Sequence, residues 1–135
     1  MKLSPKKESF RISLGTRGEI IACDYLRRRG YRILEKNFRC KMGEIDVIAE
    51  KEGRLRFIEI KTRSGPEFGR PEEAVHPAKQ RKIAMLAMWY LKEKGKDGIS
   101  VSFDVLAVDW NPSEGSPVFK LIQDAFEADS DLWAS

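Results

Sequence analysis

The feature that most constrains the fold is a hairpin pattern between residues 43 and 62. Two runs rich in branched apolar residues, GEIDVIAE and LRFIEIKT, flank the short polar segment KEGR, which contains a glycine. Branched apolar runs on either side of such a segment are typical of two antiparallel strands joined by a tight turn. The chain is therefore predicted to contain a β-sheet that includes this hairpin.

The rest of the sequence predicts helices and further strands around the hairpin. We expect a helix over about 14–29, where apolar residues recur at helical spacing and Gly30 follows a basic last turn. A second helix is expected over about 77–94, beginning at a proline. Further strands are predicted at residues 31–38, 99–110 and 118–126. The order αβββαββ predicts an α/β fold, with a mixed sheet of about five strands flanked by helices.

Length and composition fit one folded domain with two short ends. The chain has 135 residues, of which 41% are hydrophobic, enough for a single core. We expect a flexible basic arm over 1–13, the α/β domain over 14–126 and an acidic tail over 127–135. The two cysteines and the single histidine do not fit a zinc site, and Cys23 is expected in the core.

Apolar runs and net charge suggest where the protein acts and on what. No run approaches the roughly 20 residues that span a bilayer, and the N-terminus lacks the apolar core of a secretory signal. We therefore expect a cytoplasmic protein with no membrane partner. The net charge is +4, although acids gather in the tail. A basic domain fits a polyanionic partner such as nucleic acid, and ordinary solubility explains the charge equally well.

Alternation along the hairpin strands predicts which side chains share a face. On the first strand we expect Ile45, Val47 and Ala49 on one face, and Glu44, Asp46 and Ile48 on the other. If KEGR forms the loop, the register places Asp46 opposite Glu59 and Glu44 opposite Lys61. Two carboxylates are thus predicted to face each other across the hairpin.

Facing carboxylates require something to offset their repulsion. A hard divalent cation would do so, because such ions take oxygen ligands. Lys61, two residues beyond Glu59 on the same face, could reach a water or phosphate oxygen near that cation. This pattern indicates metal-assisted phosphodiester hydrolysis. The alternative is a solvated strand face on which Lys61 neutralises Glu44 and Glu59.

Two further polar side chains could join this site. Gln80 precedes Ile83 by three residues on the inner face of the second helix, so its amide is expected to point toward the sheet. A local hydrogen bond at the helix N-terminus is the alternative. Glu19 lies one helical turn before Ala22 and Cys23 and could add a carboxylate, unless it is simply an exposed helical glutamate.

These residues give the chain a family resemblance. The motifs GEIDVIA, FIEIKTR, FG at Phe68 and Gly69, EEAVHPAKQRKI and FDVLAV cover roughly residues 14–109. Together they resemble the PD-(D/E)xK nuclease superfamily, which has a restriction-endonuclease-like core. The closer resemblance is to the bacterial YraN family, whose relatives include archaeal Holliday-junction resolvases. The residue before Asp46 is Ile45 rather than the proline of the superfamily name.

The resemblance implies roles for the polar residues of the nuclease-like domain. Asp46 and Glu59, with the backbone carbonyl of Ile60, would bind Mg2+ or Mn2+, and Lys61 would be the catalytic lysine. Gln80 and Glu19 match the family's helical glutamine and glutamate. The implied activity is metal-dependent DNA endonuclease activity, on branched or damaged DNA. The alternatives are a non-catalytic DNA-binding or repair accessory protein, and an RNA-processing enzyme.

Basic residues around the proposed site predict contacts with DNA. Phosphate contacts would give largely sequence-independent binding, whereas a solvated surface charge is the alternative for each residue. The candidates are Arg39, Lys41, Arg63, Arg70, Lys79, Arg81 and Lys82. Since two strands of a junction must be cut, the resemblance also suggests a homodimer. The segment 89–91 (WYL) is one candidate surface for it, although we favour the core face of the second helix for this segment.

Overall fold

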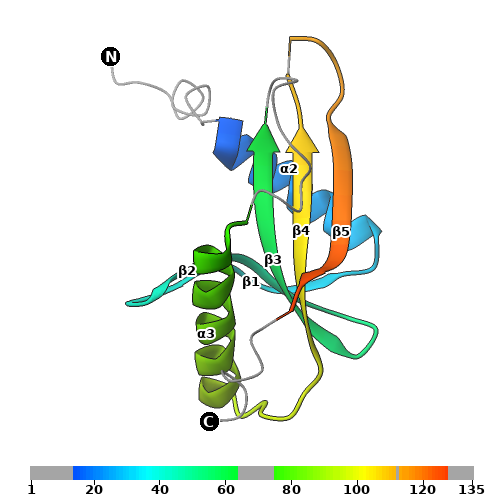
Figure 1. The fold of residues 1–135 in the computed structure, drawn as a ribbon. Helices are drawn as coiled ribbons and strands as arrows, with labels where there is room; N and C mark the ends of the chain where they lie inside the picture. Colours follow the sequence, from blue (N-terminus) through cyan, green and yellow to red (C-terminus); the bar gives the residue numbers. More distant parts are fainter. Residues whose placement is uncertain (1–13, 64–74, 112, 128–135) are drawn as a thin grey trace, which may run out of the picture.

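The computed structural model describes residues 14–63, 75–111 and 113–127 (Figure 1). Its elements are α2 (Leu14–Arg28), β1 (Arg32–Cys40), β2 (Gly43–Lys51), β3 (Arg54–Arg63), α3 (Pro77–Glu93), β4 (Val101–Asp109) and β5 (Val118–Phe126). This order and these bounds confirm the predicted αβββαββ fold. No described helix is long and apolar enough to cross a membrane. The expected arm and most of the acidic tail lie outside the described residues.

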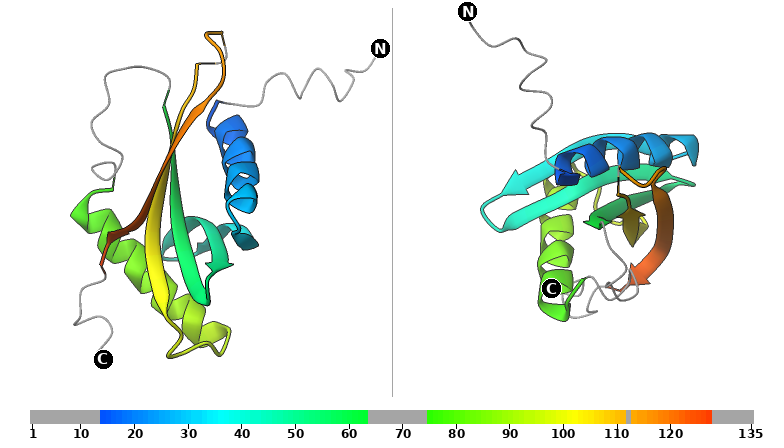
Figure 2. Two further views of the ribbon diagram at one scale, coloured as in Figure 1. Left: turned by 90° about the vertical axis from the view of Figure 1, so that its right-hand side faces the viewer. Right: turned by 90° about the horizontal axis from the view of Figure 1, so that it is seen from above.

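One mixed sheet holds all five strands in the order β1-β2-β3-β4-β5. Its neighbouring strands are antiparallel except for β3 and β4, which are parallel. Parallel neighbours need a long crossover, and α3 lies in the segment that connects them. The two helices cover opposite faces of the sheet (Figure 2). This α/β arrangement agrees with the restriction-endonuclease-like core expected from the sequence.

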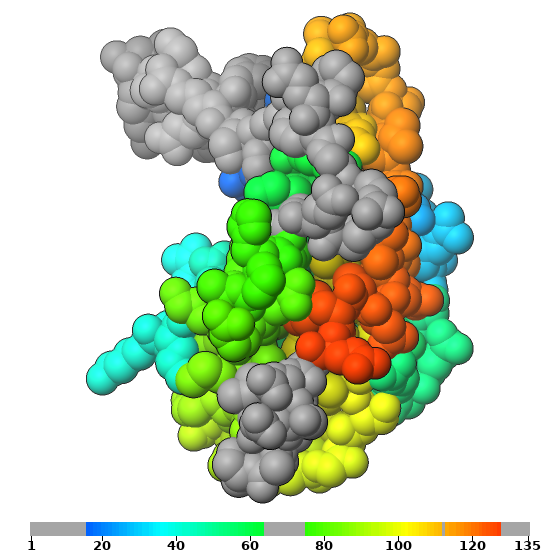
Figure 3. Space-filling model, in the orientation of Figure 1, coloured from blue at the N-terminus to red at the C-terminus, as the bar shows by residue number. Residues whose placement is uncertain are grey.

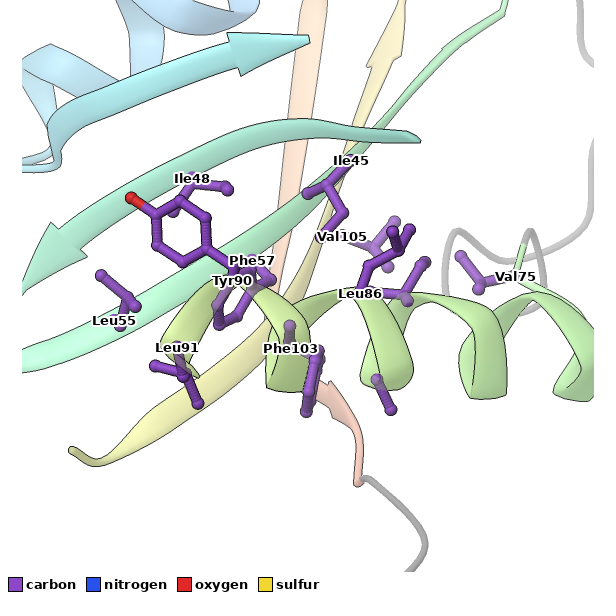
Figure 4. Packing of buried hydrophobic residues seen from close by; sticks show 13 residues of the cluster. Ile45, Ile48, Leu55, Phe57, Val75, Leu86, Tyr90, Leu91, Phe103 and Val105 are labelled. Carbon is purple, nitrogen blue, oxygen red and sulfur yellow. The ribbon is translucent and has the colours of Figure 1, made fainter. Parts of the chain in front are cut away.

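The core beneath α3 is built around aromatic rings. Phe57 of β3 packs edge-on against Tyr90 of α3, with ring centroids 5.9 Å apart, and stacks on Phe103 of β4 at 5.8 Å (Figure 4). Tyr90 and Leu91 are buried, which confirms the core interpretation for these two residues of the WYL segment. Trp89 instead remains 40% exposed.

The core beneath α2 is made of smaller side chains. Ala22 and Leu26 pack on the sheet, and Cys23 is buried there as a free thiol, as predicted. Gly18 lies close against the sheet: a Cβ built on it would lie 2.1 Å from Oγ1 of Thr62. No side chain larger than hydrogen fits there without movement, so Gly18 fixes how near α2 lies to β3.

The far end of the sheet holds a buried polar network centred on Asp104 of β4. Its carboxylate accepts hydrogen bonds from the Tyr31 and Ser102 hydroxyls and forms an ion pair with Arg56 of β3. It also accepts the backbone N–H of Asp124 at 2.9 Å, where β5 adopts a left-handed φ of 52°. Asp104 is fully buried, so these partners satisfy a charge that would otherwise be costly.

The hairpin register follows the prediction for most of its length. Ile48 pairs with Phe57 as expected, and the turn is tighter than KEGR because Lys51 and Arg54 also pair. The central residues Glu52 and Gly53 both have positive φ, as a two-residue hairpin turn requires. The β2–β3 pairing ends at Val47 and Ile58, however, so the expected Asp46–Glu59 pair lies just beyond the ladder.

One predicted face of β2 is wrong. Val47 and Ala49 belong to the core beneath α2, but Ile45 packs with Ile48 in the core beneath α3. The alternation therefore breaks at Asp46. At this point β2 has left β3 and pairs only with β1, whose residue Asn37 has a left-handed φ of 53°. Irregular strand geometry of this kind changes the direction of successive side chains, which strict alternation does not anticipate.

Candidate functional site

The separation of β2 from β3 leaves a strand edge that Asp46 fills. Its Oδ2 accepts a hydrogen bond from the backbone N–H of Ile60 at 2.8 Å. In an extended strand, the N–H and C=O of one residue point to the same side. The Ile60 carbonyl therefore also faces this edge. The structure thus brings together the Asp46 carboxylate and the Ile60 backbone, two of the three ligands expected from the sequence.

Glu59 places the second carboxylate beside Asp46. It is only 8% exposed, and its Oε1 forms an ion pair with Nζ of Lys79. Its Oε2 is buried and has no hydrogen-bond donor among the described residues. Asp46 and Glu59 line the same pocket, and the charge of Asp46 acts on the Glu59 carboxyl. The two acids predicted to face each other therefore meet, although no regular strand pairing holds them.

Both acids line a pocket of about 520 Å³ between the sheet and α3. The remaining lining residues are Gly43, Glu44, Ala78, Lys79, Lys82, Ile83 and Leu86. The tip of the β1–β2 hairpin projects beside α3 on this side of the molecule (Figure 3). The pocket combines three carboxylates with two lysines, a composition suited to binding a cation together with an anionic ligand.

Burial makes the acids of this pocket unusual. It is the main reason that the pKa of Glu59 rises to about 7, and the neighbouring charge of Asp46 raises it further. Burial also raises the pKa of Asp46, although the hydrogen bond from Ile60 and the charge of Lys79 oppose this rise. The pair therefore resists carrying two negative charges near neutral pH.

Glu19 approaches Asp46 from the other face of the sheet. A smaller pocket of about 240 Å³ beneath α2 is lined by Glu19, Asp46 and Ile60, among others. Burial raises the pKa of Glu19, and the charges of Asp46 and Glu44 add to this effect. Glu19 therefore meets Asp46 but does not line the pocket that holds Glu59. Within the described residues, no group of three His, Cys, Asp or Glu has the spacing of a metal site.

The structure places Lys61 and Gln80 at the margin of the site. Lys61 is exposed and lines neither of the two pockets. The Gln80 amide donates to the backbone carbonyl of Val75 at 2.9 Å. That bond is the local alternative considered for Gln80 from the sequence, and it arises because Gln80 lies in the first turn of α3, close to the preceding chain.

The predicted DNA-contacting cations have different surroundings. Arg63 is buried and pairs with Asp109, its register partner on β4, with Nε 2.9 Å from Oδ1. Arg39 pairs with Glu44 at 2.9 Å on the surface. The residues Lys41, Arg81 and Lys82 are exposed. Arg70 lies outside the described residues. Only part of the predicted set is therefore presented to solvent.

The contact that sequence reasoning missed is the ion pair between Lys79 and Glu59. From sequence alone, Lys79 is expected on the basic surface. It lies four residues before Ile83, which is buried, so the helical period already indicated an inward-facing position. Gln80 and Lys79 lie three and four residues before Ile83, so the helical spacing that predicts an inward-facing Gln80 predicts the same for Lys79.

Fold and site together define a class: an α/β domain whose mixed sheet bears a buried carboxylate pair where two central strands separate. The family model described as "Uncharacterised protein family UPF0102" matches residues 18–108. The chain belongs to the UPF0102 family, which is the YraN family of the predicted resemblance.

Similar proteins from several bacteria support this assignment. A UPF0102 protein of Syntrophotalea carbinolica is 50% identical over 98 residues, 73% of this chain and 80% of the relative. One from Syntrophus aciditrophicus is 45% identical over 116 residues, 86% and 90% respectively. A third, from Clostridium kluyveri, is 42% identical over 119 residues, 88% and 98%. The similarity therefore extends over nearly the whole length of these relatives.

Proposed function

We propose that the protein is a metal-dependent DNA endonuclease whose active site is the pocket between the sheet and α3. The observation that carries this proposal is Oε2 of Glu59, which is buried beside Asp46 without a hydrogen-bond donor among the described residues. A buried carboxylate oxygen without a partner is costly. A hard divalent cation would satisfy it, with Asp46 and the Ile60 carbonyl as further oxygen ligands.

The chain's own groups would hold Mg2+ or Mn2+ and orient the reactants. When bound, the cation supplies a Lewis acid for the phosphate and lowers the pKa of the attacking water. The Ile60 N–H fixes one oxygen of Asp46, which leaves the other oxygen for the cation. Lys61, two residues beyond Glu59 along β3, would orient a water or phosphate oxygen and offset developing negative charge.

The remaining predicted residues have supporting roles in this proposal. The Gln80 amide nitrogen is held by Val75, so the amide oxygen is left to accept from a water. Glu19 would influence the site through its contact with Asp46. Lys41, Arg81 and Lys82 are exposed and would contact DNA phosphates without reading sequence. Branched or damaged DNA is the proposed substrate, and a homodimer the proposed assembly for cutting two strands.

The experiment compares cleavage of branched and linear DNA in Mg2+ or Mn2+ with cleavage in EDTA. We expect metal-dependent cleavage that falls by at least about 100-fold in Asp46→Asn, Glu59→Gln and Lys61→Ala, because the first two remove metal ligands and the third removes a charge that offsets the transition state. Glu93→Gln, which removes an exposed charge at the end of α3, is the matched control. Cleavage that survives both Asp46→Asn and Lys61→Ala would exclude this site.

A second candidate is a non-catalytic DNA-binding protein that retains the nuclease fold. The observation favouring it is the ion pair in which Lys79 already neutralises one oxygen of Glu59. Binding of DNA with no cleavage of any tested branched or linear substrate, and no heat of Mn2+ binding in calorimetry, would support this alternative.

A further inference from the structure

The ion pair between Lys79 and Glu59 lies within the proposed metal site, not on the surface around it. Lys79 projects from the first turn of α3, and its side chain is half exposed, whereas that of Glu59 is 10% exposed. Burial lowers the pKa of Lys79, but the hydrogen bond and charge of Glu59 outweigh this, with Asp46 and Glu44 adding to the rise. The net effect raises the pKa, so the ammonium stays charged in the pocket.

This ammonium is an incomplete substitute for a divalent cation. It occupies Oε1 of Glu59 and leaves Oε2 of the same carboxylate without a donor among the described residues. Lys79 lines the pocket together with Glu44, Asp46 and Glu59. Among the described residues, Glu44 pairs with Arg39 and Lys79 pairs with Glu59, so one ammonium serves the two buried acids Asp46 and Glu59.

A divalent cation held by Asp46 and Glu59 would meet this ammonium at close range. Two cations on one carboxylate repel each other, and the repulsion is strong in a partly buried pocket because screening by water is weak. Lys79 has a long, rotatable side chain that is half exposed, so it can leave Glu59 at little conformational cost.

We propose that Lys79 is a built-in counter-ion that holds Glu59 in the metal-free protein and is displaced when a divalent cation binds. The inference rests on the proposed metal site. In this proposal Lys79 competes with the cation for Glu59, whereas the sequence predicts only a contact between Lys79 and a DNA phosphate. Once displaced, Lys79 would stand beside Lys82 at the rim of the same pocket, where both ammonium groups can contact a DNA phosphate.

The test measures Mn2+ affinity by calorimetry at pH 8.5, without DNA, for wild type, Lys79→Met and Lys82→Met. Methionine keeps an unbranched apolar stem like that of lysine but has no ammonium to pair with Glu59. We expect Lys79→Met to bind Mn2+ about tenfold more tightly than wild type, since no ion pair must be broken. Lys82→Met removes an equal charge from the same pocket without breaking the pair with Glu59. It therefore measures the effect of the lost charge alone, and its gain in Mn2+ affinity should be clearly smaller.

Thermal unfolding provides a second, independent readout. In EDTA we expect Lys79→Met to unfold at a lower temperature than wild type, because Glu59 loses its counter-ion. Saturating Mn2+ should raise the melting temperature of Lys79→Met more than that of wild type, as tighter ligand binding requires.

The outcomes separate this inference from the proposed function. Equal Mn2+ affinities for wild type and Lys79→Met, a weaker affinity for Lys79→Met, or equal gains in Lys79→Met and Lys82→Met would overturn the counter-ion role while leaving the metal site intact. If none of the three proteins binds Mn2+, the proposed function fails and the counter-ion role fails with it.

Discussion

The carboxylate of Asp46 accepts the backbone N–H of Ile60 at a point where β2 no longer pairs with β3. A side chain thereby replaces the ladder hydrogen bond that the departing strand would have provided. The same contact holds one oxygen of an acid that is proposed to bind a cation. A single residue thus satisfies the freed backbone N–H and orients an oxygen that is proposed to bind a cation.

The contact predicts that two substitutions of Asp46 differ in stability. Asp46→Asn keeps an oxygen that can accept from Ile60, whereas Asp46→Ala leaves a part-buried N–H without a partner. Since both remove the negative charge, the difference isolates the hydrogen bond, and we expect Ala to cost about 1–2 kcal/mol more than Asn. Urea unfolding of the two variants measures this difference, and equal stabilities would contradict a structural role for the bond.

The raised pKa of Glu59 predicts how stability changes with pH. Its folded pKa of about 7 lies above its ordinary value of 4.5, so the neutral form favours folding. This contribution is fully present below about pH 4.5, is lost as pH rises toward 7, and then stays constant. In EDTA, Glu59→Gln should therefore gain on wild type over this range, by about 3 kcal/mol.

Unfolding of wild type and Glu59→Gln at a series of pH values from 4 to 8.5 checks this expectation. The acids away from Asp46 and Glu59 titrate in both proteins, so their effects cancel in the comparison. Parallel stability curves would show that Glu59 has an ordinary pKa and is better solvated than its position indicates.

The close approach of Gly18 to Thr62 predicts an effect of unusual sign. In an exposed helix interior, Gly→Ala stabilises by up to about 1 kcal/mol. Here the new Cβ would overlap the Thr62 side chain, so we expect Gly18→Ala to destabilise by about 1–3 kcal/mol. Thr62→Ala removes the two nearest atoms, and the double variant should recover part of the loss. Chemical denaturation of all four proteins tests this, and an absence of recovery would place the strain elsewhere.

The buried network at Asp104 predicts strong coupling to Arg56. Removing the carboxylate in Asp104→Ala leaves the guanidinium of Arg56 buried without its partner, at a cost of about 3–5 kcal/mol. Replacing both residues, with Asp104→Ala and Arg56→Met, should cost less than the sum of the single changes. A double-mutant cycle measures the coupling. Additive losses would show that the pair contributes little beyond its separate contacts.

Sequence pattern predicted most of the fold because the relevant signals are local. The turn between Lys51 and Arg54 fixes the hairpin register, and the apolar periodicity defines both helices. The predicted face of Ile45 was wrong because alternation assumes an uninterrupted strand, whereas β2 loses its pairing with β3 beyond Val47 and the neighbouring strand has a left-handed φ at Asn37.

The surroundings of the candidate site residues were harder to predict. That Asp46 and Glu59 meet follows from counting residues along two strands. The burial of Arg63 depends instead on its register with Asp109 across a parallel pair formed by residues far apart in sequence. The pairing of Lys79 with Glu59 depends on how α3 is seated on the sheet. Contacts of this kind are set by tertiary packing, which no local pattern encodes.

Asp46 lines the pocket beneath α3 and also the pocket beneath α2. A sheet normally insulates its two faces from each other, but at this position one carboxylate is shared by both. The pKa of Glu19 on the α2 side is raised in part by the charge of Asp46. Loss of the Asp46 charge, by protonation or by a bound cation, would therefore lower the pKa of Glu19 on the opposite face.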